Sequence, residues 1–255
     1  MITDSFDNKS KPFITAEDFY TKTDRDDSLI CIVTYSRPTL RKIVEQYNGE
    51  LYVTYKTTSD IFEIYSFIYE NHKYLVYATY IGAALAATVM YEVATITGCH
   101  KFVYFGSCGV LDEEKCRNKI IVPTSSYRDE GISYHYKQAS DFIDIRNNEI
   151  IASILKENNI PFVQGKIWTT DAFYMETVNK VNKHKAEGVI AVDMEISGVE
   201  AVGQYYDIDN YNILFPADSL ADESFWQRVD MGNHNEKDLQ MRTFLIALLI
   251  ASKIK

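Results

Sequence analysis

An apolar run that ends in acidic residues and then changes to a helical pattern constrains the fold of this chain most. Residues 188–192 are apolar, Asp193 and Glu195 follow, and apolar residues then recur every three or four positions from Ile196. This pattern predicts a strand that turns into a helix, with Glu195 at the carboxyl edge of a sheet, where open α/β folds bind ligands. A carboxylate there suits two neighbouring hydroxyl groups. The alternative is that both acids only favour the start of the helix.

Three other apolar runs also end in polar residues. Residues 101–105 lead into Gly106-Ser107-Cys108-Gly109, residues 120–122 lead into a polar, charged loop, and residues 212–217 end at Asp218. Two glycines around a serine allow the backbone to approach a ligand and direct N–H groups at an anion. The competing interpretation of this tetrapeptide is a plain tight turn. The pattern predicts that polar groups gather at one edge of a sheet.

Strand and helix patterns alternate along the chain, which predicts an α/β fold with much parallel sheet. Residues 1–27 are polar with few such signals, so we expect an N-terminal arm or cap, followed by a single domain over residues 28–255. Further expected strands cover residues 30–34, 51–55, 62–69, 74–80 and 162–168, and expected helices start near Leu40 and cover residues 83–97 and 149–158.

The amino-acid composition limits the kinds of molecule that the chain is expected to bind. The formal net charge of -10 over 255 residues argues against nucleic acid as a partner, because phosphate neutralisation needs clustered Lys and Arg. The apolar run 244–251 is too short to span a bilayer and predicts a C-terminal helix packed on the sheet, so no membrane partner is expected. No Cys pair has metal-site spacing and the five histidines are scattered, which predicts no metal. Without a secretory N-terminus, we expect a cytoplasmic protein with reduced cysteines.

Five motifs, in this order, carry a family resemblance: GSCGVL, IIVPTSSYRDEGISYHY, GKIWTTDAFYMET, VDMEISG and FPADSLADESFW. Together they resemble the nucleoside phosphorylase family, which includes hexameric purine nucleoside phosphorylases, uridine phosphorylases and related nucleosidases. The resemblance implies a three-layer α/β/α fold with a twisted, partly closed mixed central sheet. It also implies cleavage of the N-glycosidic bond of a nucleoside, inorganic phosphate as co-substrate with no other cofactor, and a homo-oligomer, either a dimer or a trimer of dimers.

The resemblance also implies roles for the ribose-binding residues. Glu195 accepts the 2′ and 3′ hydroxyls, and Met194 packs under the sugar. His135 reaches the 5′ hydroxyl, from the same or a neighbouring subunit, although a surface histidine is the alternative.

The base-binding residues follow from the same resemblance. Phe173 and Tyr174 lie where the family stacks the base, with core packing as the alternative. Asp218 matches the acid of the purine branch that protonates N7 of the leaving base, and a helix cap is its alternative role. The uridine branch uses a Gln and an Arg, and here Gln164 is present but Lys166 stands where Arg is expected. Purine is therefore favoured.

The phosphate-binding pattern is incomplete. Ser107 and the Gly106 backbone match the family, but the family arginine before them corresponds to Tyr104. The Gly-Asp-Pro-x-Arg loop is replaced by residues 35–39, in which Arg37 is the remaining charge, or only a solvated residue at the start of a helix.

From these residues we expect phosphorolysis of a purine nucleoside to free base and ribose 1-phosphate. The alternatives are a uridine phosphorylase, a phosphate-independent nucleosidase, and a non-catalytic nucleoside-binding protein that has lost the phosphate site. No acid occupies residues 34–40, so the glutamate that the family's nucleosidases use to activate water is also missing.

Overall fold

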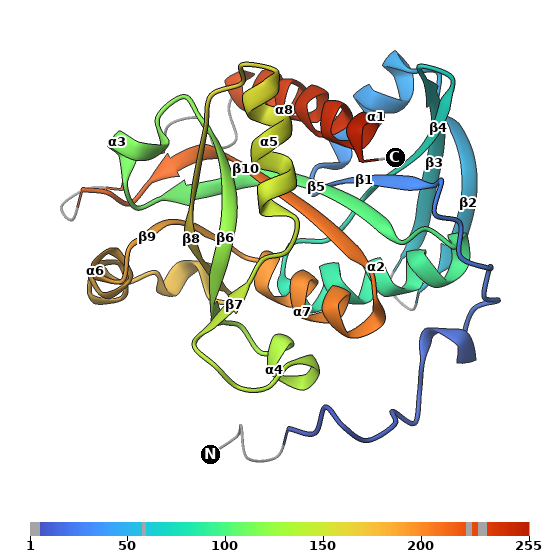
Figure 1. Ribbon diagram of the computed structural model, residues 1–255, viewed down its shortest axis with the longest axis horizontal. Coiled ribbons are helices and arrows are strands. Elements are labelled where there is room, and N and C mark those ends of the chain that lie inside the picture. Colours follow the sequence, from blue (N-terminus) through green and yellow to red (C-terminus); the bar gives the residue numbers. More distant parts are fainter. Residues whose placement is uncertain (1–5, 58–59, 223–225, 229–233, 255) are drawn as a thin grey trace.

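The computed structural model describes residues 6–57, 60–222, 226–228 and 234–254, with only the backbone for 234–237. Within these residues, ten strands form one mixed sheet (Figure 1). The strands are β1 Ile30–Thr34, β2 Glu50–Lys56, β3 Ile61–Tyr69, β4 His72–Ala78, β5 Lys101–Val110, β6 Ile120–Asp129, β7 Phe142–Asp144, β8 Phe162–Thr170, β9 Val189–Asp193 and β10 Asp209–Ser219.

Half of the sheet closes on itself. The strand order is β10-β6-β8-β9-β5-β1-β4-β3-β2, and β10 also pairs with β5. The strands β5, β9, β8, β6 and β10 therefore form a closed ring, whereas β1, β4, β3 and β2 extend from it as an open wing. β5 runs parallel to β10 and antiparallel to β9. The predicted partly closed, mixed sheet is confirmed.

Helices cover both faces of this sheet, as Figure 1 shows. α1 Arg37–Gln46, α5 Asn148–Glu157 and α8 His234–Lys253 pack on one face, and α2 Ala83–Thr97 and α7 Ile196–Tyr206 pack on the other. The short helices are α3 Glu113–Cys116, α4 Ser133–Tyr136 and α6 Val178–Ala186, with 3₁₀ turns at Ala16–Asp18 and Phe173–Met175. The three predicted layers are thus present.

The C-terminal helix packs on the sheet as its apolar run predicts. Phe244, Ala247, Leu248 and Ala251 are buried in the core cluster between α8 and the sheet. Their three- and four-residue spacing places them on one face of the helix, which therefore buries an apolar stripe. In the described part of the chain, no helix is both long and apolar enough to cross a membrane.

Two predicted loops are strand instead. Gly106 to Gly109 do not form a tight turn: β5 continues through them and stays paired with β10. β6 likewise extends to Asp129, where a loop was expected, because residues 125–129 pair with β8. In both cases a parallel neighbour supplies the backbone hydrogen bonds that local sequence pattern cannot reveal.

The N-terminal segment follows the surface of α2. From residue 6 to residue 28 its regular element is the 3₁₀ turn, and the backbone of Thr23 and Asp26 donates to the carbonyls of Thr95 and Gly98. Residues 1–5 of the predicted arm lie outside the described residues. The division between an arm and one domain stays a prediction.

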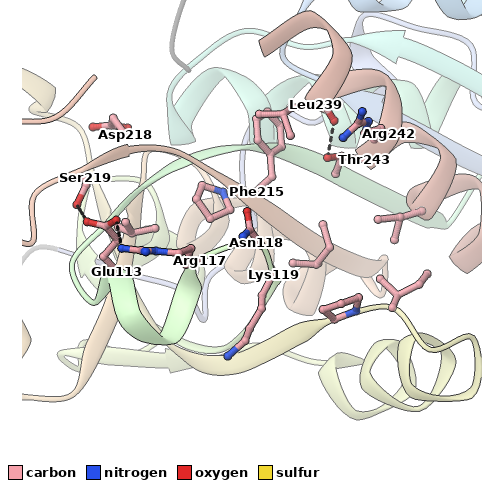
Figure 2. Close-up of a pocket in the computed structure, with 16 residues that line it drawn as sticks. Glu113, Arg117, Asn118, Lys119, Phe215, Asp218, Ser219, Leu239, Arg242 and Thr243 are labelled. Atoms are coloured by element: carbon pink, nitrogen blue, oxygen red, sulfur yellow. Dashed lines mark hydrogen bonds and ion pairs between the residues drawn. The ribbon is translucent and has the colours of Figure 1, made fainter. Parts of the chain in front are cut away.

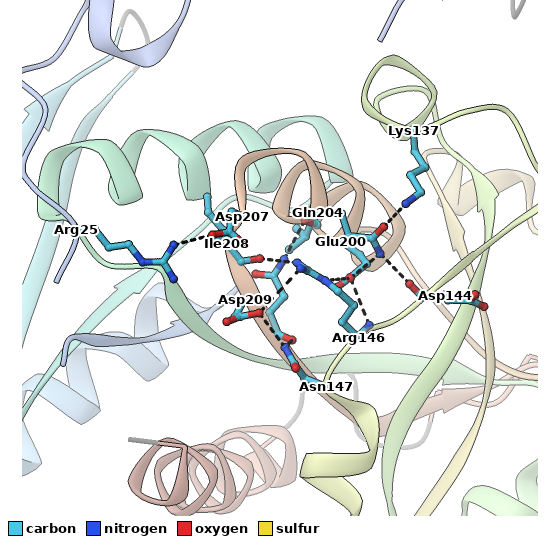
Figure 3. A network of polar contacts seen from close by, with 12 residues as sticks. Arg25, Lys137, Asp144, Arg146, Asn147, Glu200, Gln204, Asp207, Ile208 and Asp209 are labelled. Carbon is cyan, nitrogen blue, oxygen red and sulfur yellow. Dashed lines mark hydrogen bonds and ion pairs between the residues drawn. The ribbon is translucent and has the colours of Figure 1, made fainter. Parts of the chain in front are cut away.

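A buried ion pair anchors α7 (Figure 3). The carboxyl group of Glu200 is fully buried and accepts from Arg146 Nε at 2.9 Å and from Gln204 Nε2 at 2.8 Å. Arg146 also donates to the carbonyl of Ile208 at 2.6 Å. These bonds join α7 to the segment before α5 and to the start of β10, so they fix the helix that carries Glu195 at its other end.

Candidate active site

Glu195 lies at the junction of β9 and α7, as its sequence context predicts. It is the N-cap residue of α7, and its side chain is buried. Its Oε1 accepts from the backbone N–H of Gly82, the N-cap of α2, at 2.7 Å. Gly82 has φ 107°, a conformation that favours glycine. One carboxylate therefore joins the starts of two helices.

Asp193 stabilises this junction through hydrogen bonds. Its Oδ2 accepts from the backbone N–H groups of Glu195 at 3.0 Å and Ile196 at 2.8 Å, so Asp193 caps α7. Its Oδ1 accepts from Thr169 Oγ1 at 2.5 Å. Asp193 therefore has the role at the helix start that was the alternative for both acids. Glu195 makes no such bond to the first turn of α7.

The environment disfavours charge on Glu195. Burial first, and then the neighbouring Asp193, raise the pKa of Glu195 above its usual range, while the N–H of Gly82 acts in the opposite direction. Hydroxyl donors of a bound sugar would favour the ionised carboxylate. Binding of a diol at Glu195 is therefore expected to release a proton.

Tyr35 faces this carboxyl group from the end of β1. Its pKa is raised well above the usual range, by burial and then by Glu195, Tyr104 and Asp193, so its hydroxyl lies within electrostatic reach of Glu195. Its ring packs on Gly106, where a Cβ atom would lie 2.8 Å from Cδ2 of the ring. The sequence identified Tyr35 only as the residue that replaces a family glycine. Its large aromatic side chain was the available signal.

The predicted phosphate ligands differ in their surroundings. Ser107 is an exposed position within an otherwise buried part of β5. Arg37 lies at the start of α1 with a side chain that is 58% exposed, and it forms an ion pair with Asp60 and lies over the ring of Tyr80. The charge of Arg37 is therefore already neutralised by a neighbour.

Asp218 lies near the end of β10 with 2% of its surface exposed. Its Oδ2 accepts from Trp226 Nε1 at 2.8 Å. Burial raises the pKa of Asp218, and the bond from Trp226 opposes this. Asp218 pairs in register with Gly109, which pairs with Val192, three residues before Glu195. β9 and β10 run in opposite directions, so their carboxyl ends do not share one edge, but this register places Asp218 level with a residue close to Glu195.

A second carboxyl group near Asp218 was not predicted. Glu176 directly follows the 3₁₀ turn at Phe173–Met175, and its backbone N–H donates to the carbonyl of Phe173 at 3.4 Å. Burial and then Asp218 raise the pKa of Glu176 to about 8, with Lys180 acting in the opposite direction. An acid two residues after the aromatic pair was the signal in the sequence.

The other predicted sugar and base contacts differ in exposure. Met194 is half-buried between Asp193 and Glu195. The rings of Phe173 and Tyr174 meet edge to face at 5.1 Å, and Tyr174 is 95% exposed, so its ring is not part of the core.

Gln164 and His135 lie apart from these groups. Gln164 is near the start of β8, five residues before Thr169, which pairs with Asp193. Five strand residues span about 16 Å. Its amide donates to Asn148 at 3.1 Å and Glu149 at 2.8 Å, so it holds the start of α5 instead of joining the acids.

His135 is exposed on α4, and its ring contacts Phe6 at 4.4 Å. Within a single chain, His135 is therefore a surface histidine, which was the alternative to its predicted role.

A cavity of about 360 Å³ lies between β10, the α3–β6 segment and α8 (Figure 2). Phe215 contributes to it, together with the basic residues Arg117, Lys119 and Arg242. Asp218 and Arg242 lie at opposite ends in Figure 2. The cavity therefore borders the strand that carries Asp218 without enclosing Glu195.

The arrangement can support cleavage of a bond between a sugar and a base. A carboxylate that accepts two hydroxyls orients a sugar, and a buried carboxyl that holds its proton can protonate a leaving group. In the described residues, no group of three His, Cys, Asp or Glu side chains is arranged to hold a metal ion.

Comparisons with known proteins identify the family. The family model described as Phosphorylase superfamily matches residues 29–247. The chain is similar to a DeoD-type purine nucleoside phosphorylase of Brevibacillus brevis, with 26% identity over 60% of this chain and 66% of that protein. It is also similar to a DeoD-type purine nucleoside phosphorylase of Caldanaerobacter subterraneus, with 24% identity over 73% of this chain and 78% of that protein. The aligned region thus spans just under two thirds of the Brevibacillus protein.

Among solved structures, the fold is similar to that of a futalosine hydrolase mutant of Helicobacter pylori. The TM-score is 0.71 at 16% identity, and the alignment covers 88% of this chain and 99% of that chain.

Proposed function

The chain belongs to the phosphorylase superfamily, and we propose that it cleaves the N-glycosidic bond of a purine nucleoside. The observation that carries this proposal is Asp218, a buried carboxyl group of raised pKa that strand pairing places level with Val192, three residues before Glu195. Glu195 holds the 2′ and 3′ hydroxyls of ribose, with Met194 beneath the sugar. Phe173 lies beside the base.

Asp218 supplies the proton that the leaving purine needs at N7. The reaction passes through an oxocarbenium-like ribose, by analogy with other glycosidic cleavages, so the base departs with the electrons of the broken bond. Trp226 holds the Asp218 carboxyl in place through its N–H. The contacts of Gln164 with α5 give no support to the uridine alternative.

The acceptor of the ribosyl group is either phosphate or water. Phosphate, the expectation from the sequence, is supported by the exposed hydroxyl of Ser107, the backbone at Gly106 and the names of the phosphorylase relatives. Water is favoured by the ion pair between Arg37 and Asp60, because phosphate would have to compete with Asp60 for the predicted phosphate arginine.

A homo-oligomer stays part of the proposal. Large apolar side chains near the two helix starts are exposed, namely Ile81, Leu85 and Tyr174. A second copy over this surface would cover them. We also propose a cytoplasmic location, in keeping with four free cysteines.

One panel tests the proposal. Inosine, adenosine, guanosine and uridine are incubated with the purified full chain, with and without inorganic phosphate, and products are identified by chromatography and mass spectrometry. Release of a purine supports the proposal, and the sugar product names the acceptor. A chain that binds these nucleosides but releases no base would instead be a binding protein.

A further inference from the structure

We propose that three tyrosines, Tyr77, Tyr104 and Tyr35, fill the phosphate subsite of this chain, so that water is the acceptor and Tyr35 positions it. This inference rests on the proposed function and decides between its two acceptors. The three side chains form what we call the tyrosine column, on the α2 and α7 face of the sheet.

The column begins in the core. Tyr77 on β4 and Tyr104 on β5 are almost fully buried, and their hydroxyl oxygens are 3.4 Å apart. Side chains two residues apart on a strand point to the same face, so Tyr104 and the missing side chain of Gly106 share a direction. Tyr104 stands where the phosphorylases place an arginine. A neutral phenol thus replaces a cation at this position.

Tyr35 continues the column to the surface of the site. Its ring centre is 6.3 Å from that of Tyr104. Its ring carbons would lie 2.8 and 2.9 Å from a Cβ atom on Gly106, so the ring covers the side of Gly106 that a ligand would approach. The glycine thereby accommodates an aromatic ring of the same chain, which explains why only glycine fits there.

The charges near the column oppose phosphate. Once a bound diol has ionised Glu195, its carboxylate would repel a phosphate dianion held beside the Tyr35 hydroxyl. Tyr35 and Tyr104 remain neutral because burial raises the pKa of both. Arg37, the remaining cation of the loop, is paired with Asp60. A neutral water molecule is not repelled by the carboxylate, and it needs no cation to bind.

The hydrolytic step balances as follows. The C1′–N9 bond breaks with its electron pair going to the purine, and Asp218 transfers its proton to N7. A water oxygen held by the Tyr35 hydroxyl forms the new bond to C1′. The surplus proton of that water passes to solvent, from which Asp218 is reprotonated. The products are free ribose and the neutral base.

The test uses two variants and one control. Tyr35→Gly removes the ring from Gly106, Tyr35→Phe keeps the ring without the hydroxyl, and the control Tyr52→Phe removes a hydroxyl from the exposed edge strand β2. Each protein is incubated with its best purine nucleoside with and without inorganic phosphate. Ribose and ribose 1-phosphate are quantified, and phosphate binding is measured separately by calorimetry.

We expect wild type and Tyr52→Phe to form free ribose at a rate that phosphate does not change, and to bind no phosphate. Tyr35→Phe should keep that independence while kcat falls roughly five- to tenfold, with KM unchanged, because one hydrogen bond to the water is lost. Tyr35→Gly should bind inorganic phosphate measurably, and a second substitution, Tyr104→Arg, should strengthen that binding.

Ribose 1-phosphate as the product of the wild-type chain would overturn this inference and leave the proposed function intact. Phosphate binding that is equal in wild type and Tyr35→Gly would also overturn it. If no nucleoside is cleaved but Tyr35→Gly alone gains phosphate binding, the closed subsite stands and the proposed function fails.

Discussion

The substitution Asp218→Asn separates a proton donor from a structural carboxyl group. Asn has the same shape, and its Oδ1 can still accept from Trp226 Nε1, which lies 2.8 Å from the Asp218 carboxyl. An amide cannot transfer the proton that N7 requires. Positioned acid catalysis contributes about 10²–10⁴-fold, so kcat for inosine or adenosine should fall by that factor with KM nearly unchanged.

The prediction also fixes the direction in which stability and activity change with pH. Burial raises the pKa of Asp218, so the folded chain holds the proton to higher pH than the unfolded chain does. Its stability contribution is therefore fully present below the unfolded pKa and lost as pH rises through the folded pKa. Asn has no charge to bury, so the variant should lose less stability with rising pH than wild type does. Activity on purine nucleosides should fall in the same direction, because the protonated acid is required.

The assay measures the turnover of two substrates and compares the thermal unfolding of the variant with that of wild type. Turnover of inosine and of a 7-methylated purine nucleoside is measured for wild type, Asp218→Asn and the control Asp144→Asn, whose side chain is exposed on β7. The methylated base leaves without a proton, so the variant should lose far less activity on it. Equal losses on both substrates, or thermal unfolding of the variant well below wild type at pH 8, would refute the reasoning.

Three further substitutions test other residues. Glu195→Ala should lower kcat/KM at least about tenfold, because charge-assisted hydrogen bonds to the ribose diol contribute about 1.5–3 kcal/mol; unchanged kinetics would remove Glu195 from the site. Arg37→Ala should leave the rate of free-ribose formation unchanged with and without phosphate, because Arg37 is paired with Asp60. Formation of ribose 1-phosphate by wild type that is lost in Arg37→Ala would restore its predicted role. Arg146→Ala should cost about 3 kcal/mol of unfolding free energy in urea, because Glu200 remains buried without its cation; a loss under 1 kcal/mol would contradict this.

The sequence predicted the elements that have a local pattern. Helix α2 covers residues 83–97 as expected, because apolar residues fill all its faces and Gly98, at φ 73°, ends it. The junction at Glu195 was also predictable, since a buried strand that meets a helical pattern leaves few alternatives. What failed was the end of β5, where glycines suggest a turn but pairing with β10, about 100 residues away, keeps the strand extended.

The sequence names the candidate site residues, but it does not give their contacts. Pairing through β5 places Asp218 level with Val192, close to Glu195, whereas Gln164 is occupied by the start of α5. That difference depends on which end of β8 a residue occupies, and motif spacing does not contain this information. The covering of Gly106 by Tyr35 is likewise not evident from the sequence, because it joins the residue after β1 to a residue of β5 that is 71 positions away.

The closed ring of strands has a consequence for synthesis of the chain. Among the described strands, β10 leaves the ribosome after the others, and it pairs directly with both β5 and β6 and carries Asp218. Until then the nascent chain exposes two unpaired strand edges, and such edges favour aggregation. Pairing over such a long sequence separation is also slow. Catalytic competence should therefore arise in one late step, and a chain stalled before residue 209 should need a chaperone although most of its wing can already fold.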